Sequence, residues 1–513
     1  MTEDTHVASL IEYSEPQSAE VAVEWLRQFG LDACERDDRT PVERALALIP
    51  ASSRSVYPEC LAPAAALRAL AGSAEDAIRM YCKALEMSPA IRLANGIRTN
   101  LALLYSSRGE TVEADRTIAA GLDANPEDPR LRGLRGSIRA SLRDRKAQRD
   151  VDFVESVVND LPDVWQARIH IWMGMAANYL GDSARCDRSW HRAAQIAEEA
   201  RCSRLVAIAW HNLEDFFSNE IGDLARAMVY SRLAIDAAER SGDQNLSTLA
   251  CVSLYALTAE AGDRLEGQSA RALLASKRTS GRFNDRFGVI FADALWYGWS
   301  KRFDEMSNVL RKLDLGRISG SQSAVIHGLL AVALLGSEDD AKALAAARRA
   351  VADGRLSTRE SPVELRLRRI GRILGCAVLF HAEQKTEASR ALSAFREEER
   401  IPLSVRRFAD AVQRNSYAEL QTTAPDVMGY VLVLEALESV RAIHTTGAIY
   451  LTRRERQILQ LKAEGSSNAE IGATLGIDEA TVKGHNFRIF RKLNVTRGPR
   501  AVAEARRLKL ISS

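Results

Sequence analysis

The chain has 513 residues, of which 46% are hydrophobic and 27% charged, the composition of a soluble globular protein. Its 30 glycines and 13 prolines are too few for a collagen-like or low-complexity chain. No apolar run approaches the roughly 18 residues of a membrane-spanning helix, and the start, MTEDTHVASL, lacks the basic and apolar regions of a secretory signal.

Seven cysteines are scattered along the chain, and no two of them have C-x-x-C spacing. An odd number without close pairs indicates neither a disulfide framework nor a structural zinc site. Several occupy small-residue positions of helical patterns, where cysteine packs as a small hydrophobic side chain. We therefore expect reduced cysteines in a cytoplasmic protein, with one reactive thiol as the alternative.

Acidic and basic residues nearly balance, with 70 Lys and Arg against 68 Asp and Glu, but they are unevenly distributed. Residues 450–513 carry 13 basic and 6 acidic side chains, a net charge of +7, which leaves −5 for residues 1–449. A small basic segment on a larger acidic body indicates binding to nucleic acid. An ordinary solvated basic surface is the alternative.

A helical repeat is predicted for most of the chain, as Gly109 illustrates. Leu101 and Ala102 precede it and Ala114 and Ile118 follow it, a spacing typical of the tetratricopeptide repeat. Small residues let two antiparallel helices approach, and glycine ends a helix. The same offsets recur around Gly72, Gly181 and Gly222.

These spacings predict an all-α solenoid over residues 56–442, with roughly eight to ten helix pairs of about 34–40 residues each. Residues 1–55 are expected to form an N-terminal helical cap, and the short stretch 443–449, rich in small residues, a linker. A solenoid offers a concave surface suited to a peptide, a protein or a small effector. Four tryptophans of the array suggest either core packing, which we favour, or an aromatic pocket: Trp165, Trp172, Trp190 and Trp210.

The C-terminal domain, residues 450–513, is predicted to contain four helices. Thr452 with Glu455, and Ser467 with Glu470, have the spacing of capping boxes that open the first two. Asp478 is placed to cap a third helix ending near residue 494, and a fourth is expected over residues 500–508. The second and third helices fit a helix-turn-helix: Gly472 is small where the helices would touch, Gly476 lies in the turn, and Val482 is on the buried side.

The stretches LTRRERQIL, SSNAEIGATLGI, TVKGH and RKLNV resemble the LuxR-type helix-turn-helix, a four-helix DNA-binding domain. The array resembles the tetratricopeptide arrays of LuxR-family activators. The resemblance implies a transcription regulator that binds DNA as a dimer, with the third helix in the major groove and the fourth often at the dimer contact. It also implies that the positions of Lys483, Gly484 and Phe487 approach base edges.

Other residues of the third helix are candidates for contact with phosphates. Thr481 stands at the helix start, where a hydroxyl can donate to a phosphate or simply take part in the cap. Cationic side chains further along fit phosphate neutralisation, although solvated charges would look the same. The predicted DNA-binding residues are Thr481, Lys483, Gly484, Phe487, Arg488, Arg491 and Lys492. His485 is interpreted as a structural histidine rather than a switch.

Two positions depart from the family pattern. An apolar residue is usual where Asn486 stands and a polar one where Phe487 stands. Phe487 either contacts a thymine methyl group or turns inward through a small rotation of the helix. Gly484 lowers helix propensity by about 1 kcal/mol relative to alanine.

Enzymatic activity is not expected. The chain has no Gly-Lys dipeptide and therefore no P-loop, and it contains none of the motifs H-E-x-x-H, G-x-S-x-G or G-x-G-x-x-G. Its eight histidines lack metal-site spacing, so neither a metal nor a cofactor is predicted. The acidic residues near position 37 alternate with arginines and do not indicate a receiver domain.

We therefore predict a sequence-specific DNA-binding transcription regulator whose array senses an effector. Its expected partners are double-stranded DNA, an unidentified peptide, protein or small molecule on the array, a second copy of the chain and, if it activates transcription, RNA polymerase. No membrane partner is expected. The alternative is an interaction scaffold whose tail binds protein or binds nucleic acid without specificity.

Overall fold

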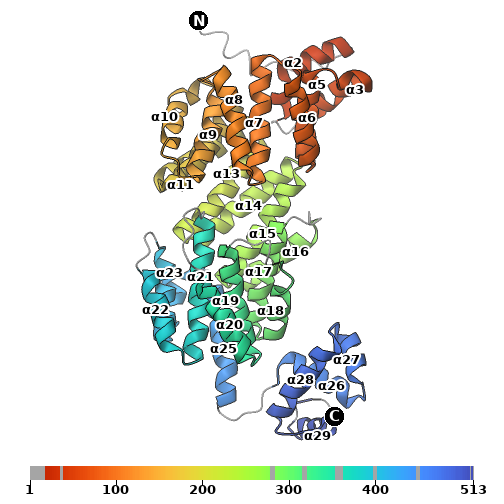
Figure 1. Cartoon of the computed structure of the whole chain (residues 1–513), viewed down its shortest axis with the longest axis vertical. Helices are drawn as coiled ribbons and strands as arrows, with labels where there is room; N and C mark the ends of the chain where they lie inside the picture. The colour runs from red at the N-terminus through yellow and green to blue at the C-terminus, as the bar shows by residue number, and fades with distance from the viewer. Residues whose placement is uncertain are drawn as a thin grey trace. The chain divides into compact units, whose positions relative to one another are not determined.

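The computed structural model describes residues 18–34, 39–277, 283–314, 320–352, 362–396, 401–445, 451–508 and 510–511. Within these ranges the chain is helical and contains no β-strand (Figure 1). The chain divides into two compact units: Met1–Leu254 with Ala272–Ser280 and Thr358–Pro362, and Tyr255–Arg271 with Gly281–Ser357 and Val363–Ser513. The predicted all-α class is confirmed.

The helices of the first unit follow one another in antiparallel pairs. Those that begin before residue 244 are α2 (Ala19–Cys34), α3 (Thr40–Leu48), α4 (Ala51–Arg54), α5 (Pro58–Leu70), α6 (Ala74–Glu86), α7 (Ile91–Ser107), α8 (Thr111–Ala124), α9 (Pro129–Ser141), α10 (Ala147–Val157), η1 (Val158–Asp160), α11 (Asp163–Leu180), α12 (Ser183–Glu199), α13 (Ser203–Phe216), η2 (Phe217–Ile221) and α14 (Leu224–Arg240). The division between the units falls within α15 (Gln244–Ala261).

The second unit continues the repeat pattern. Its helices before the C-terminal domain are α16 (Arg264–Ala275), which the first unit shares, α17 (Phe283–Trp299), α18 (Phe303–Leu310), α19 (Gly320–Gly336), α20 (Asp340–Ala352), α21 (Pro362–His381), α22 (Lys385–Arg396), α23 (Leu403–Arg414), α24 (Leu420–Thr423), η4 (Pro425–Val427) and α25 (Met428–Thr445). α25 reaches Thr445, into the range predicted as a linker, and the remainder, 446–449, lies outside the described residues.

The glycines that revealed the repeat occupy the turns between paired helices. Gly72, Gly109, Gly181 and Gly222 have φ angles of 85°, 77°, 79° and 78°, a left-handed conformation that glycine adopts without steric cost. In the Gly109 repeat the predicted small and bulky positions that follow, Ala114 and Ile118, are fully buried. The tetratricopeptide-like spacing thus corresponds to real helix pairs.

Three of the four tryptophans of the array lie in the core. Trp165, Trp172 and Trp190 are 9%, 4% and 2% exposed. Trp210 is partly buried and stacks on Tyr230 with ring centroids 5.5 Å apart. Burial in the core agrees with the interpretation favoured from the sequence, and Trp172 in addition lines a cavity of the first unit.

None of the helices that the structure describes combines the length and the hydrophobicity needed to cross a lipid bilayer.

Two glycines allow α19 and α21 to pack at unusually close range. A Cβ on Gly371 of α21 would overlap the backbone carbonyl group of Ala324 in α19. A Cβ on Gly328 of α19 would lie 2.7 Å from the carbonyl oxygen of Gly371. Backbone atoms cannot rotate away as a side chain can, so each extra methyl group would push the helices apart.

We predict that Gly371→Ala lowers the free energy of unfolding by about 1–3 kcal/mol, the usual cost of overpacking a core. Gly320→Ala in α19 is the matched control, because nothing lies within 4 Å of a Cβ at that position. Thermal and urea unfolding of both variants followed by circular dichroism measures the difference. Equal stability of the two variants would contradict the close packing of α19 and α21.

Candidate nucleic-acid interface

The C-terminal domain consists of four short helices, the first three of which begin at a side-chain cap. They are α26 (Arg453–Ala463), α27 (Asn468–Leu475), α28 (Glu479–Lys492) and α29 (Gly498–Arg507). Both predicted capping boxes are present, Thr452 with Glu455 and Ser467 with Glu470. Asp478 caps α28 by accepting from the Thr481 amide at 2.6 Å. The hydrogen bonds from this backbone amide and the Thr481 side chain lower the pKa of Asp478.

The turn between α27 and α28 has the geometry that its glycines predict. Gly476 ends α27 in the left-handed region, with φ 65°. A Cβ on Gly472 would lie 2.7 Å from the carbonyl oxygen of Ile477, so only glycine fits at this contact. The residues that form the domain's buried core come from all four helices and the segment before α26: Leu451, Ile458, Leu459, Ile471, Val482, Ile489, Leu493, Ala501 and Ala505.

The polar Asn486 lies inside the C-terminal domain and the apolar Phe487 lies on its surface, the reverse of their usual preferences. Phe487 is 70% exposed, whereas Asn486 is 5% exposed. Asn486 Nδ2 donates to Asn468 Oδ1 at 3.0 Å, which provides a polar partner inside the domain. Because this hydrogen bond satisfies the buried Asn486 amide, α28 does not have to rotate to bring Phe487 inward. Phe487 therefore remains on the outer face of α28.

His485 packs on the inner side of α28 and is 5% exposed. Burial lowers its pKa to about 4, with the nearby charge of Asp304 acting in the opposite direction. The ring is therefore neutral near pH 7. This agrees with its interpretation as a structural histidine.

The outer face of α28 presents Lys483, Gly484 and Phe487 together. The Lys483 side chain is 64% exposed, and its Nζ lies 2.9 Å from Glu479 Oε1 one turn earlier. Nothing lies within 4 Å of a Cβ built on Gly484. At the helix start the Thr481 hydroxyl donates to Asp478 Oδ2 at 3.1 Å, so it takes part in the cap. An apolar ring, an open glycine and a cation thus share one accessible helix face.

The C-terminal end of α28 contacts acidic and carbonyl groups of the array within the second unit. Arg488 Nη1 donates to the Ser337 carbonyl oxygen at 3.1 Å. Arg491 Nη2 and Lys492 Nζ lie 3.0 and 3.2 Å from carboxylate oxygens of Glu338. Three of the seven predicted DNA-binding residues therefore have partners on the array.

Lys492 also has a partner inside its own domain. Its Nζ donates to Glu455 Oε2 at 2.9 Å, and its side chain is only 7% exposed. Burial raises the pKa of the Glu455 carboxyl, and the charge of Lys492 opposes that shift. The bond connects α26 to α28. Lys492 is thus less accessible to a DNA phosphate than Arg491, whose side chain is 58% exposed.

Two side chains that lie outside the predicted site residues connect the helices of the domain by hydrogen bonds. Arg454 Nη2 donates to the carbonyl oxygen of Leu475 at 2.5 Å, which connects α26 to the end of α27. Asn468 Oδ1 accepts from Lys462 Nζ at 3.0 Å as well as from Asn486. The only sign of these contacts in the sequence is the polar residue Asn486 at a usually apolar position, because a buried amide needs a hydrogen-bond partner.

Comparison with known proteins places this domain in a family. Residues 450–505 match the family described as bacterial regulatory proteins, luxR family. The transcriptional regulatory protein DegU of Brevibacillus brevis is 49% identical over 55 residues, which make up 11% of this chain and 23% of that protein. The CsgBAC operon transcriptional regulatory protein of Escherichia coli (strain K12) is 40% identical over 62 residues, 12% of this chain and 29% of that protein.

The chain thus spans less than a third of the length of either relative. The crystal structure of the yeast Tom70 aligns with 76% of this chain and 96% of its own, at 13% identity and a TM-score of 0.28. The array is defined by its own helix pairs. Residues 450–505 form a LuxR-type helix-turn-helix domain, and a tetratricopeptide-like helical array precedes it.

We predict that Gly484→Ala stabilises the C-terminal domain by up to about 1 kcal/mol, because alanine has the higher helix propensity and its methyl group meets open space. Gly472→Ala is the matched comparison and should lower stability, because its methyl group meets the Ile477 carbonyl. Thermal unfolding of the full chain measures both. A destabilised Gly484→Ala variant would show that this face of α28 is not open.

Proposed function

We propose that this protein is a sequence-specific DNA-binding transcription regulator. The observation that carries the proposal is the accessible face of α28, where Lys483 and Phe487 flank Gly484 on the second helix of a helix-turn-helix. A helix fits the major groove of B-DNA, whose base edges present a distinct pattern for each base pair. The LuxR-type family of the domain and its relatives among transcriptional regulators support the same function.

In this proposal α28 enters the major groove and three positions face the bases. The Lys483 ammonium reaches acceptors on guanine, for which it must leave Glu479. Phe487 contacts a thymine methyl group, and Gly484 lets the backbone come close. Arg488 and Arg491 neutralise phosphates, and Thr481 contributes its hydroxyl at the helix start. Lys492 joins them only if it leaves its carboxylate partners.

The array is proposed to sense an effector. Support comes from a cavity of about 330 Å³ in the first unit, large enough for a small organic molecule. Its wall is mostly apolar and includes a few polar groups, among them Asn100, Arg168 and Arg204. Arg168 lies 5.5 Å from the centre of the Trp165 ring, and Arg204 is paired with Asp243 at 3.1 Å. A peptide or protein on the array remains an alternative effector.

Glu338 is proposed to link the array to DNA binding. It pairs with Arg491 and Lys492, cations that DNA phosphates would otherwise attract. While these pairs persist, DNA binding must first break them, so the array lowers the affinity of the domain for DNA. An effector that separates α28 from Glu338 would raise that affinity by population shift.

Further partners follow from the family of the domain. A second copy of the chain would place two α28 helices on successive major grooves, since such regulators bind paired half-sites. RNA polymerase is a partner if the protein activates transcription. The competing proposal is an interaction scaffold, which the concave surface of a helical array also favours.

We predict that Lys483→Ala weakens binding to a cognate site about ten- to hundredfold, because a good base contact contributes about 1–3 kcal/mol. Gel shift or fluorescence anisotropy with DNA from upstream of the protein's own gene measures this. Lys385→Ala is the matched control, since Lys385 is also an exposed lysine, 3.3 Å from a glutamate. Wild type and Lys483→Ala binding all sequences equally would favour the scaffold.

We predict that Glu338→Gln raises the DNA affinity of the full chain about two- to fivefold, because its partly exposed ion pair with Arg491 contributes up to about 1 kcal/mol. Glu383→Gln is a close control: both glutamates have left-handed backbones, with φ 62° at Glu338 and 60° at Glu383. Anisotropy titrations at one salt concentration compare the variants. If Glu338→Gln binds DNA as tightly as wild type does, the array does not restrain DNA binding through Glu338. The proposal that the domain binds DNA is not affected by that result.

A further inference from the structure

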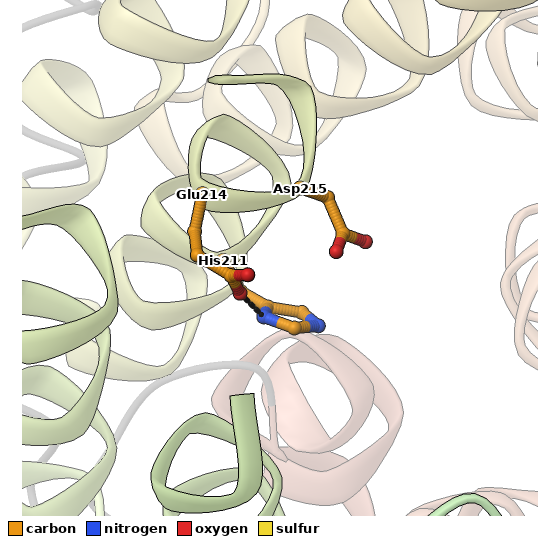
Figure 2. A group of neighbouring side chains, drawn as sticks. All are labelled: His211, Glu214 and Asp215. Atoms are coloured by element: carbon orange, nitrogen blue, oxygen red, sulfur yellow. Dashed lines mark hydrogen bonds and ion pairs between the residues drawn. The ribbon is translucent and has the colours of Figure 1, made fainter. Parts of the chain in front are cut away.

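Three potential metal ligands lie together on α13, outside the C-terminal domain. His211, Glu214 and Asp215 stand at positions i, i+3 and i+4, so they share one face of the helix (Figure 2). His211 Nδ1 lies 2.8 Å from Glu214 Oε2. One ligand atom from each residue lies within 4.8 Å of the other two.

The cluster carries more negative than positive charge in a desolvated place. The Glu214 side chain is 3% exposed and that of His211 18%. Two adjacent carboxylates thus face a single imidazole, and even a protonated His211 balances only one of them.

The imidazole of His211 is the cationic neighbour of both carboxylates. Among the described residues the Asp215 carboxylate has no hydrogen bond or ion pair, whereas Glu214 is held by His211 and by the Ser253 hydroxyl of α15. The side chains leave α13 toward the same side, with the Asp215 carboxylate beside the ring (Figure 2). A cation between these groups would offset the repulsion of the two carboxylates.

The backbone after Asp215 is held in an unusual conformation. α13 runs into a π-helical turn, Phe217–Ile221, a feature often found at functional sites. Ser218 Oγ and Asn219 Nδ2 both donate to the Asp215 carbonyl oxygen, at 3.1 and 2.9 Å. These bonds fix the main chain from which the Asp215 carboxylate projects.

We propose that His211, Glu214 and Asp215 form a binding site for a divalent transition-metal ion. One imidazole nitrogen and two carboxylate oxygens match the ligand set of Zn²⁺ or Mn²⁺. Metal–ligand distances of about 2.0–2.2 Å place ligand atoms roughly 3–4 Å apart, which small rotations of these side chains achieve. The ion displaces the proton shared by His211 and Glu214, and water or an effector completes its coordination.

A single histidine followed three and four residues later by acids is typical of an ordinary solvated helix face, so no metal site was predicted here. The site does not rest on the proposed DNA-binding function. Metal binding is measured independently of DNA.

The test is calorimetric titration of the chelator-treated full chain with Zn²⁺ and, separately, Mn²⁺. Mn²⁺ is included because it binds thiolates weakly, which separates this site from the seven cysteines. Wild type is expected to bind one ion per chain, and Asp215→Asn to bind at least tenfold more weakly. Asp187→Asn is the matched control, because Asp187 Oδ1 lies 3.2 Å from His191 Nδ1 in a second pair of aspartate and histidine.

Circular dichroism verifies that Asp215→Asn is folded, and Glu214→Gln serves as a second variant with the same expected loss. Asp187→Asn should bind the ion as wild type does. The proposal is overturned if wild type binds neither ion, or if Asp215→Asn and Glu214→Gln bind as tightly as wild type.

Discussion

The architecture of this protein depends on helices that approach more closely than ordinary side chains allow. At Gly174 the space that a Cβ would occupy is taken by the Trp190 indole, whose Nε1 donates to the Ile171 carbonyl oxygen at 3.1 Å. At Gly336 the ring of Phe303 fills the corresponding place. A glycine on one helix and an aromatic ring on its neighbour therefore set the distance between the pair, because close-packed interiors tolerate neither gap nor overlap. The same pairing of a glycine with an aromatic ring thus occurs at these two places in the array.

The same close approach of helices occurs in the C-terminal domain, where it sets the direction of α28. Gly472 lets α27 meet the turn before α28, so the direction of α28 is determined by a backbone contact. The hydrogen bond between Asn468 and the buried Asn486 then fixes its rotation, since a buried amide needs a partner. With that rotation set, Phe487 faces solvent. A polar contact on the inside thus decides which side chains α28 presents on its outer face.

The net charge of the whole chain, +2, hides two parts of opposite charge. The +7 of residues 450–513 and the −5 of the remainder describe a basic domain on an acidic array. Only the fold shows where the two meet, at Glu338 and the C-terminal end of α28. Lys492 lies between Glu338 and Glu455, so one cation serves both the internal structure of the domain and its contact with the array.

The sequence by itself determined the helical class, the turn glycines of the repeat and the caps of the C-terminal helices. These features depend on local rules: a left-handed turn favours glycine, as at Gly109, and an exposed amide at a helix start favours an acceptor such as Asp478. The inward position of Asn486, the acidic partner of Arg491, and the burial of Glu214 beside His211 were decided by the tertiary structure. Burial and long-range pairing depend on segments far apart in the chain, and no local pattern specifies which of them will meet.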